Sequence, residues 1–259
     1  GGDPNMGTGA MGQPADPTVW SPCPTTGHQP LPATIYEIKT PEGFTDDSLV
    51  VVEGVVTARR MNAEGKYSHI TLQVPTDAAH YVGPEKSGVW IYLNGSNDPA
   101  LQINPPVEGA VVKVHALTTN FYDQLELYKV VCMEMINGTG TVPTPVDVLP
   151  AEVGTGEGER GVLMGRGEEL EGVLARVQNV KVTATNPAIG PGDGQDPNTM
   201  QMVPTNEFVV DGNLRINDFL YLIDPAPAQN TQFSSITGVL RWGNANMKLE
   251  PRSAADVSQ

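Results

Sequence analysis

The stretch VEGVV at 52–56 decides how the whole chain is interpreted, because close variants of it return three times. These are VEGAV at 107–111, LEGVL at 170–174 and ITGVL at 236–240. Each variant places a glycine before two apolar residues, at the beginning or in the interior of a strand-like segment. Glycine in a strand permits a bulge or a sharp bend, and a small closed sheet needs such bends in order to curl. The recurrence therefore predicts two small barrels, whereas accidental repetition in a valine-rich chain is the alternative.

Longer segments also match between different parts of the chain, which extends the repeat beyond its glycines. The matched pairs are EGAVVKVHAL (108–117) with EGVLARVQNV (171–180), VVVEGVVTA (50–58) with SSITGVLRW (234–242), and VWIYLNG (89–95) with DFLYLID (218–224). A chain of 259 residues is long enough for two small domains. We therefore expect an all-β protein with two consecutive OB-fold-like five-stranded barrels.

Alternating apolar residues mark the expected strands. In SHITLQV (68–74), Ile70, Leu72 and Val74 face one way, and VWIYL (89–93) alternates in the same manner. The other expected strands are 111–117, 124–130, 170–185, 207–212, 214–223, 234–242 and 246–251. Helical signal is confined to short turns near 77–82 or 100–103.

Proline, glycine and threonine divide the chain into three expected parts. Residues 1–32 are rich in these types and lack any period, so they predict a flexible N-terminal arm or linker. The segment 137–150 is a natural boundary, which places the first barrel at 33–140 and the second at 141–257.

The charge balance bears on which partners the protein can bind. The formal charge is −15, with 15 basic against 30 acidic residues, and no basic cluster exceeds Arg59-Arg60. A generic phosphate-binding surface needs lysine and arginine, so sequence-independent nucleic-acid binding is disfavoured. An acidic surface favours solubility and affinity for cations.

The two cysteines, Cys23 and Cys132, suggest an oxidising compartment. A pair of cysteines in a chain rich in proline and glycine is compatible with one disulfide in an exported protein. Two unrelated free thiols are the alternative. No apolar run reaches the roughly 18–20 residues that span a bilayer, so no transmembrane segment is expected.

Several segments resemble a known family of regions. TIYEIKT (34–40), LVVVEGVVTA (49–58), LEGVLARVQNVKVT (170–183) and SSITGVLRWGNANMKLEPRSAADV (234–257) resemble the tandem OB-fold lead-in region of secreted bacterial nucleases. That region precedes a catalytic domain of the endonuclease/exonuclease/phosphatase type. The resemblance implies an exported bacterial protein, periplasmic, extracellular or held at the cell surface like a lipoprotein. It also implies an accessory region of an enzyme, with the catalytic domain absent from this chain.

Aromatic pairs are the candidate ligand-binding residues. Trp90 and Tyr92 share one face of an expected strand, and Phe219 and Tyr221 occupy the matching positions in the second unit. Phe121 and Tyr122, in the connection between two strands, can join the same surface. Aromatic side chains on an OB-fold face stack on bases or sugar rings. Packing between the barrels is the alternative use of these rings.

The loop 186–200 offers a possible calcium site. Asp193, Asp196 and Asn198 are closely spaced among glycines, and calcium takes carboxylate and amide oxygens as ligands. The run lacks the complete spacing of an EF-hand loop, and a solvated loop is the alternative.

No catalytic signature is present in the sequence. The histidines show no H-E-x-x-H spacing, and there is no G-x-S-x-G elbow. We therefore expect a non-catalytic exported binding or targeting module for nucleic acid or glycan. A structural spacer or protein-interaction domain of the cell envelope is the alternative, and a metal-dependent hydrolase is a further one.

Overall fold

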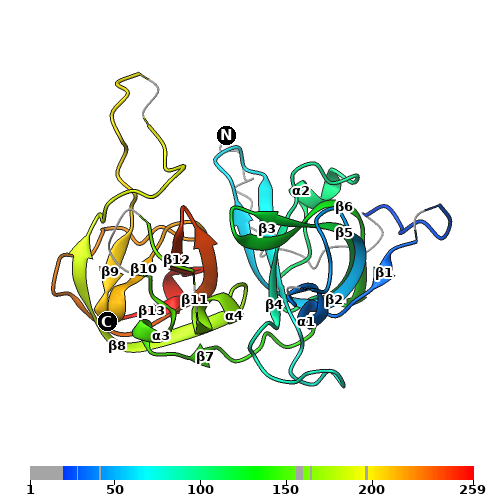
Figure 1. Ribbon diagram of the computed structural model, residues 1–259, viewed down its shortest axis with the longest axis horizontal. Coiled ribbons are helices and arrows are strands. Elements are labelled where there is room, and N and C mark those ends of the chain that lie inside the picture. The colour runs from blue at the N-terminus through cyan, green and yellow to red at the C-terminus, as the bar shows by residue number, and fades with distance from the viewer. Residues whose placement is uncertain (1–19, 28, 41, 156–159, 164, 196–197) are drawn as a thin grey trace, which may run out of the picture.

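Two β-barrels lie side by side in the computed structural model (Figure 1). The structure describes residues 20–259 except 28, 41, 156–159, 164 and 196–197. The longest α-helices in the described part of the chain have four residues, so none of its helices could cross a membrane.

The first barrel is a closed ring of five strands. These are β2 (Leu49–Met61), β3 (Tyr67–Gln73), β4 (Gly88–Tyr92), β5 (Val111–Phe121) and β6 (Gln124–Asn137). The order β2-β3-β4-β6-β5 closes through pairing of β5 with β2, and β4 runs parallel to β6. This is the Greek-key arrangement of an OB-fold.

The second barrel repeats this topology. Its strands are β8 (Leu174–Thr185), β9 (Phe208–Val210), β10 (Leu214–Ile216), β11 (Gln232–Gly243) and β12 (Asn246–Glu250). The order β8-β9-β10-β12-β11 closes through β11 and β8, and β10 runs parallel to β12. The fold class of two consecutive OB-fold-like barrels is therefore confirmed.

Within the described ranges, three short strands and several short helices lie outside the two five-stranded barrels. The remaining strands are β1 (Leu31–Pro32), β7 (Val146–Asp147) and β13 (Val257–Ser258). The helices are α1 (Ile35–Ile38), α2 (Ala100–Ile103), α3 (Pro150–Val153), α4 (Arg166–Glu169), η2 (Asp211–Asn213) and η3 (Ala254–Asp256). The expected turn at 100–103 is thus α2, while 77–82 contains turns without a helix.

The repeated glycines serve two local purposes. Gly54 and Gly238 lie inside β2 and β11, where a Cβ on Gly238 would sit 2.5 Å from the Glu250 carbonyl oxygen. Gly109 and Gly172 instead precede β5 and β8 with φ of +90° and +80°, a conformation that suits glycine. The similar sequences therefore match the first strand of one barrel with the fourth strand of the other. These are the two strands whose pairing closes each ring, β2 with β5 and β8 with β11.

The long strand expected at 214–223 is wrong beyond Ile216. The chain leaves the sheet there because the buried Glu250 carboxylate accepts hydrogen bonds from Asn217 Nδ2 (2.9 Å) and from the Phe219 backbone N–H (3.1 Å). Phe219 and Tyr221 consequently lie on an irregular segment and are not counterparts of Trp90 and Tyr92.

The segment from Trp20 is attached to the first barrel. Cys23 and Cys132 form a disulfide across a sequence separation of 109 residues, which the chain-entropy model values at about 5 kcal/mol. Trp20 is buried and donates from Nε1 to the Asn104 carbonyl oxygen (2.9 Å). Residues 1–19 of the expected arm lie outside the described residues.

Candidate functional site

The outer face of β3 and β4, expected to carry the ligand, is covered by the second barrel. Trp90 is fully buried, and its Nε1 donates to the Leu240 carbonyl oxygen (3.1 Å). The Leu174 backbone N–H donates to Gln73 Oε1 (3.2 Å). One face of β3 and β4 is therefore occupied by the barrel core, and the part of the other face around Trp90 and Gln73 by the seam between the barrels. The structure thus gives Trp90 a packing role.

Phe219 also belongs to the seam, where it contacts charged groups. Its ring lies 4.1 Å from the Arg60 guanidinium carbon and 3.8 Å from that of Arg241, both measured to the ring centroid. The His69 ring lies 5.1 Å from it. Such cation–π contacts hold both arginines in place against the second barrel.

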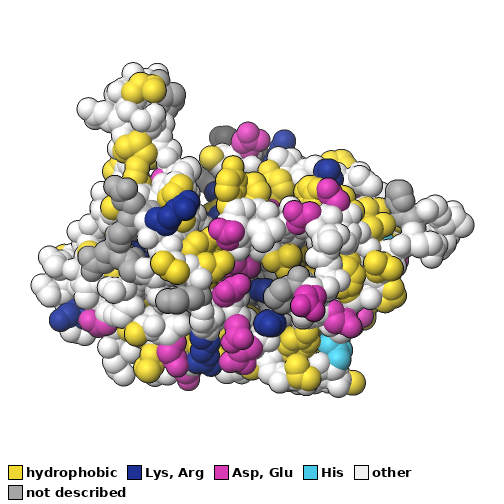
Figure 2. Space-filling view, viewed as in Figure 1, with side chains coloured by type: hydrophobic (Ala, Val, Ile, Leu, Met, Phe, Trp, Pro, Cys, Tyr) yellow, Lys and Arg dark blue, Asp and Glu magenta, His cyan; other side chains and the backbone are white. Residues whose placement is uncertain are grey.

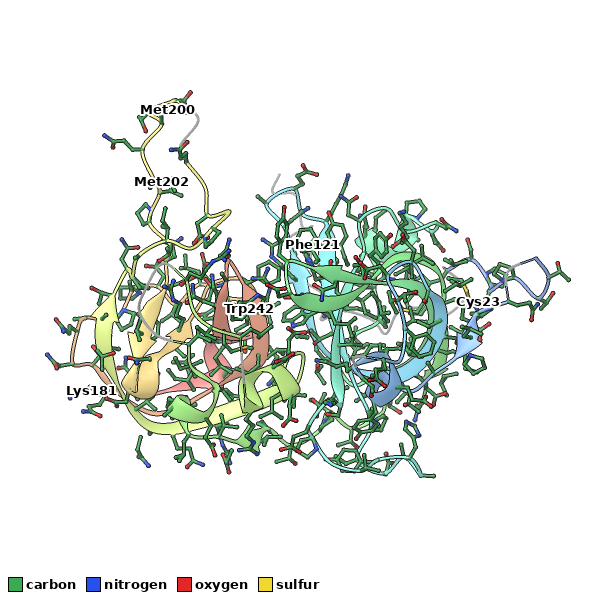
Figure 3. The ribbon with its side chains drawn as sticks, in the orientation of Figure 1. Cys23, Phe121, Lys181, Met200, Met202 and Trp242 are labelled. Atoms are coloured by element: carbon green, nitrogen blue, oxygen red, sulfur yellow. A yellow bond between two sulfur atoms is a disulfide. The ribbon has the colours of Figure 1, made fainter. Side chains whose placement is uncertain are left out.

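An open groove begins where this packing ends. It has a volume of about 790 Å³ and is formed by both barrels. Its aromatic lining is Tyr92, Phe121, Tyr122, Tyr128 and Trp242. Figure 3 labels Phe121 on the first barrel and Trp242 on the second, at the edges that face each other. The groove is therefore accessible and rich in flat apolar surface.

The tight turns of two hairpins form opposite walls of the groove. In the β5–β6 hairpin, Tyr122 and Asp123 have φ of 49° and 70°, the pair of positive values typical of a type I′ turn. In the β11–β12 hairpin, Asn244 and Ala245 have φ of 52° and 56°. These are the connections between the fourth and fifth strands of each barrel, a usual ligand-contacting loop of OB-folds.

The two turns present their side chains differently. Phe121 and Tyr122 are 56% and 82% exposed, and their rings contact each other edge to face at 4.8 Å. Trp242 is buried in the opposite wall. The exposed pair can therefore change its surroundings on binding, while the wall opposite is fixed.

Ionisable groups at the floor of the groove have shifted pKa values. Burial raises the pKa of Glu126 to about 7, against an opposing effect of Arg241 and with a contribution from Glu171. Burial, together with Arg241 and Arg60, lowers the pKa of His69 to about 3. Glu126 can therefore lose its charge near neutral pH, whereas His69 stays neutral.

Two further hollows adjoin the groove. One, of about 670 Å³, shares Asp123 with it and contains more carboxylates than cations, including Glu168, Glu169 and Glu171. The other, of about 380 Å³, shares His69 and Tyr92 with it. Figure 2 shows acidic side chains gathered along the middle of the molecule, where the barrels meet. The surroundings of the groove are therefore acidic.

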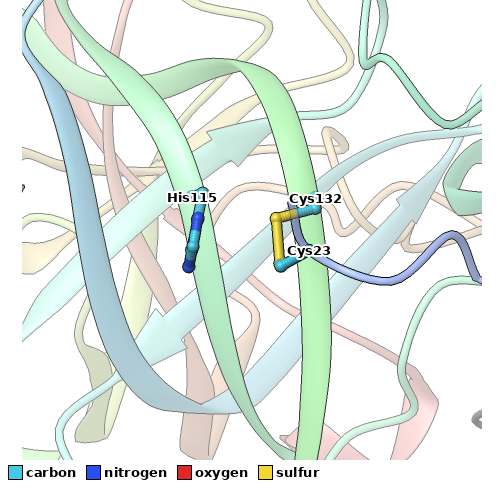
Figure 4. Close-up of side chains that lie close together, drawn as sticks. All are labelled: Cys23, His115 and Cys132. Carbon is cyan, nitrogen blue, oxygen red and sulfur yellow. A yellow bond between two sulfur atoms is a disulfide. The ribbon is translucent and has the colours of Figure 1, made fainter. Parts of the chain in front are cut away.

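The expected calcium site at Asp193, Asp196 and Asn198 lies partly outside the described residues and stays a prediction. Asp193 closes a local turn, since its Oδ2 accepts from the Gly190 backbone N–H (2.7 Å). Asp196 lies outside the described residues, and Asn198 has interactions of its own. Among described residues, metal-ligating types converge only at Cys23, His115 and Cys132, where both sulfurs belong to the disulfide (Figure 4).

The structure brings some of the expected ligand-binding residues together and separates others. Tyr92, Phe121 and Tyr122 line the groove, whereas Trp90 and Phe219 pack in the seam and Tyr221 is outside the groove lining. Three further groove residues, Glu126, Arg241 and Trp242, were not predicted from the sequence. Glu126 lies between the apolar residues Leu125 and Leu127 in the sequence. A single carboxylate among apolar strand residues was the signal that could have predicted it.

Comparisons with known proteins give no family. No protein-family model and no curated protein match the chain. Among solved structures, it is similar to a chain described as an aspartyl-tRNA synthetase from Leishmania major Friedlin, with 15% identity and a TM-score of 0.30. That match covers 57% of this chain and 28% of the other.

A single-stranded DNA-binding protein from Thermus aquaticus is also similar, with 10% identity and a TM-score of 0.20. The match covers 78% of this chain and 87% of that one. These likenesses are too distant to carry an argument about function, which therefore depends on the groove itself.

Proposed function

We propose that this chain is a non-catalytic binding module that holds a glycan in the groove between its barrels. The observation that carries the proposal is the aromatic lining contributed by both barrels, with two exposed rings on the β5–β6 turn. Sugar rings present C–H faces that pack on aromatic side chains, and their hydroxyl groups bond to polar neighbours. Gln124 and Asn244 supply such polar neighbours in the groove.

The charge distribution favours glycan over nucleic acid. The groove contains two guanidinium groups, Arg160 and Arg241, and two carboxyl groups, Asp123 and Glu126. A single-stranded nucleic acid carries a phosphate at every nucleotide and gains affinity by releasing counterions to lysine and arginine. The acidic hollow beside Asp123 would repel such a chain.

The proposal is tested by calorimetric titration of a panel of neutral and acidic oligosaccharides. Phe121→Ala and Tyr122→Ala should each weaken binding about 10-fold, which corresponds to about 1.4 kcal/mol for the loss of one ring that packs on a sugar. Ile103→Ala, an exposed apolar residue on α2, is the matched control and should leave binding unchanged. Tight, salt-sensitive binding of single-stranded DNA without any glycan binding would refute the proposal.

A structural spacer is the second candidate, and the buried seam favours it. Trp90 and the ties between Gln73 and Leu174 hold the barrels together without any ligand. A rigid pair of barrels is what a spacer or a protein-interaction domain of the cell envelope needs. Absence of binding to every glycan and nucleic acid in the panel would leave this candidate in place of the first.

We also propose that the protein acts outside the cytoplasm. The Cys23–Cys132 disulfide supports this, because disulfides persist mainly in oxidising compartments. The resemblance to accessory regions of secreted bacterial nucleases agrees with an exported module and with a catalytic domain elsewhere in the same protein. A metal-dependent hydrolase remains the least supported alternative, and metal-dependent cleavage by the purified chain would favour it.

A further inference from the structure

Arg241 is held rigidly at the groove, yet its hydrogen-bonding capacity is unused. Its guanidinium group lies over the Phe219 ring, and Nη1 is 3.8 Å from Glu250 Oε1, which is an ion pair but too long for a hydrogen bond. Its Nε is buried and has no acceptor among the described residues. A guanidinium group has five N–H donors, and here none of them donates to a described residue.

The position of the guanidinium group is fixed by its own strand. Arg241 and Gly243 both lie on β11, and a Cβ added to Gly243 would sit 2.5 Å from Arg241 Nη1. The absence of a side chain at 243 therefore leaves room for the guanidinium group beside the groove. A planar fork that is already immobilised loses little entropy when it binds a carboxylate.

The neighbouring groups allow one negative charge but not many. Glu126 faces the same part of the groove, and its carboxyl group is uncharged at slightly acidic pH because burial raises its pKa to about 7. Arg160 adds a second guanidinium group to the lining. Beyond Asp123, however, the adjoining hollow holds more carboxylates than cations, with Glu168 and Glu169 among them. A ligand with one carboxylate at Arg241 and neutral groups on either side fits this distribution.

We propose that Arg241 binds a sugar carboxylate, so that the ligand is a glycan in which uronic-acid residues are separated by neutral residues. This inference rests on the proposed glycan-binding function and names the ligand class of that site. It differs from a polyanion such as nucleic acid, because the groove offers two guanidinium groups, Arg160 and Arg241, and the adjoining hollow holds more carboxylates than cations.

The test compares a hyaluronan hexasaccharide with the same oligosaccharide after chemical reduction of its carboxyl groups. At pH 6 and 0.15 M salt, the acidic form should bind at least 10-fold more tightly to the unmodified protein. Arg241→Lys keeps the charge but loses the fork, and should abolish this preference without changing affinity for the reduced form. Gly243→Ala displaces the guanidinium group and should act in the same direction.

Arg59→Gln is the matched control, because Arg59 pairs with Glu108 outside the groove. Thermal melting of each variant verifies that it folds. Equal binding of the two oligosaccharides, unaltered by Arg241→Lys, would overturn the inference and leave glycan binding intact. Binding of neither would overturn the proposed function.

A direct readout keeps the inference testable in that second case. In a ¹⁵N-labelled sample titrated with sodium glucuronate, the Arg241 Nε–H resonance should shift, while that of Arg59 should not. No shift of the Arg241 resonance at millimolar glucuronate would overturn the inference by itself.

Discussion

Glu126 is a carboxyl group in a strand whose neighbours are apolar, and it is only 6% exposed. The groups around it are Gln124 on the same strand, Arg241 on β11 and Glu171 just before β8. No cation forms an ion pair with it among the described residues, so burial dominates and raises its pKa from the ordinary 4.5 to about 7. The folded protein therefore retains a proton that the unfolded chain releases at a lower pH.

This shift predicts how stability depends on pH. The contribution of Glu126 is complete below about pH 4.5 and is lost as the pH rises through about 7. Glu126→Gln should therefore raise the free energy of unfolding at pH 8 by on the order of 2 kcal/mol, with no gain at pH 4.5. Urea unfolding at both pH values measures the difference. Glu53→Gln, at an exposed position, is the control, and an equal gain in both variants would contradict the assignment to Glu126.

At this scale the sequence predicted which residues share a face but not what covers that face. Alternation placed Trp90 and Tyr92 together, opposite Ile91, and the structure has this arrangement. Trp90 is buried by residues far along the chain, such as Leu240, which is 150 residues away, and Phe219, whereas Tyr92 lies at the groove. No local pattern contains these contacts.

Gly238 shows how one position constrains a whole strand. It lies in β11, which pairs with β8 on one side and β12 on the other, and the Glu250 carbonyl of β12 leaves no room for a Cβ. We expect Gly238→Ala to lower the free energy of unfolding by about 2–3 kcal/mol, because rigid backbone must move. Gly138→Ala, at a site with nothing within 4 Å, should change it by less than 1 kcal/mol. Similar melting temperatures for the two variants would argue against this steric role.

At the scale of elements, period-two alternation predicted β3, β4, β5 and β6 well, because each has one face in a barrel core. The alternation failed after Ile216. The apolar sequence of 218–223 is typical of a strand, but Asn217 and Phe219 instead donate hydrogen bonds to the Glu250 carboxylate. Hydrogen bonds from this segment to a side chain of a distant strand outweigh its local preference for extended structure. Such bonds cannot be predicted from the periodicity of apolar residues.

A pair of glycines lies at the contact between the two barrels. A Cβ on Gly88 would overlap the Gly172 carbonyl group, and a Cβ on Gly172 would lie 2.7 Å from the Gly88 carbonyl carbon. Gly88 belongs to β4, whereas Gly172 belongs to the repeated phrase before β8. The glycine of the repeated motif at 170–174 thus also permits the close contact between the two barrels.

Gly88→Ala should therefore separate the barrels without unfolding either. We expect a larger radius of gyration in small-angle X-ray scattering and increased exposure of Trp90, detected by a red shift of its fluorescence. Gly138→Ala is again the control. An unchanged radius of gyration with unchanged fluorescence would show that the glycine contact does not set the arrangement.

The relative placement of the barrels could not be predicted from the sequence. Each barrel has its own periodic pattern, but the seam depends on single residues such as Trp90 and Lys39, whose Nζ donates to the Glu171 carbonyl oxygen (2.6 Å). Candidate residues of the groove were consequently predicted where they are aromatic and belong to the first barrel, as Phe121 and Tyr122 do, whereas Arg241 and Trp242 on the facing barrel were not.

A cleft whose opposite walls belong to separate folded units responds to mechanical load. We expect traction that pulls one barrel from the other to widen the gap between the Tyr122 and Asn244 turns before the strands of either barrel separate, because the two turns belong to different barrels. A ligand that contacts both walls resists this widening. The affinity for such a ligand and the stiffness of the two-barrel unit should therefore increase or decrease together.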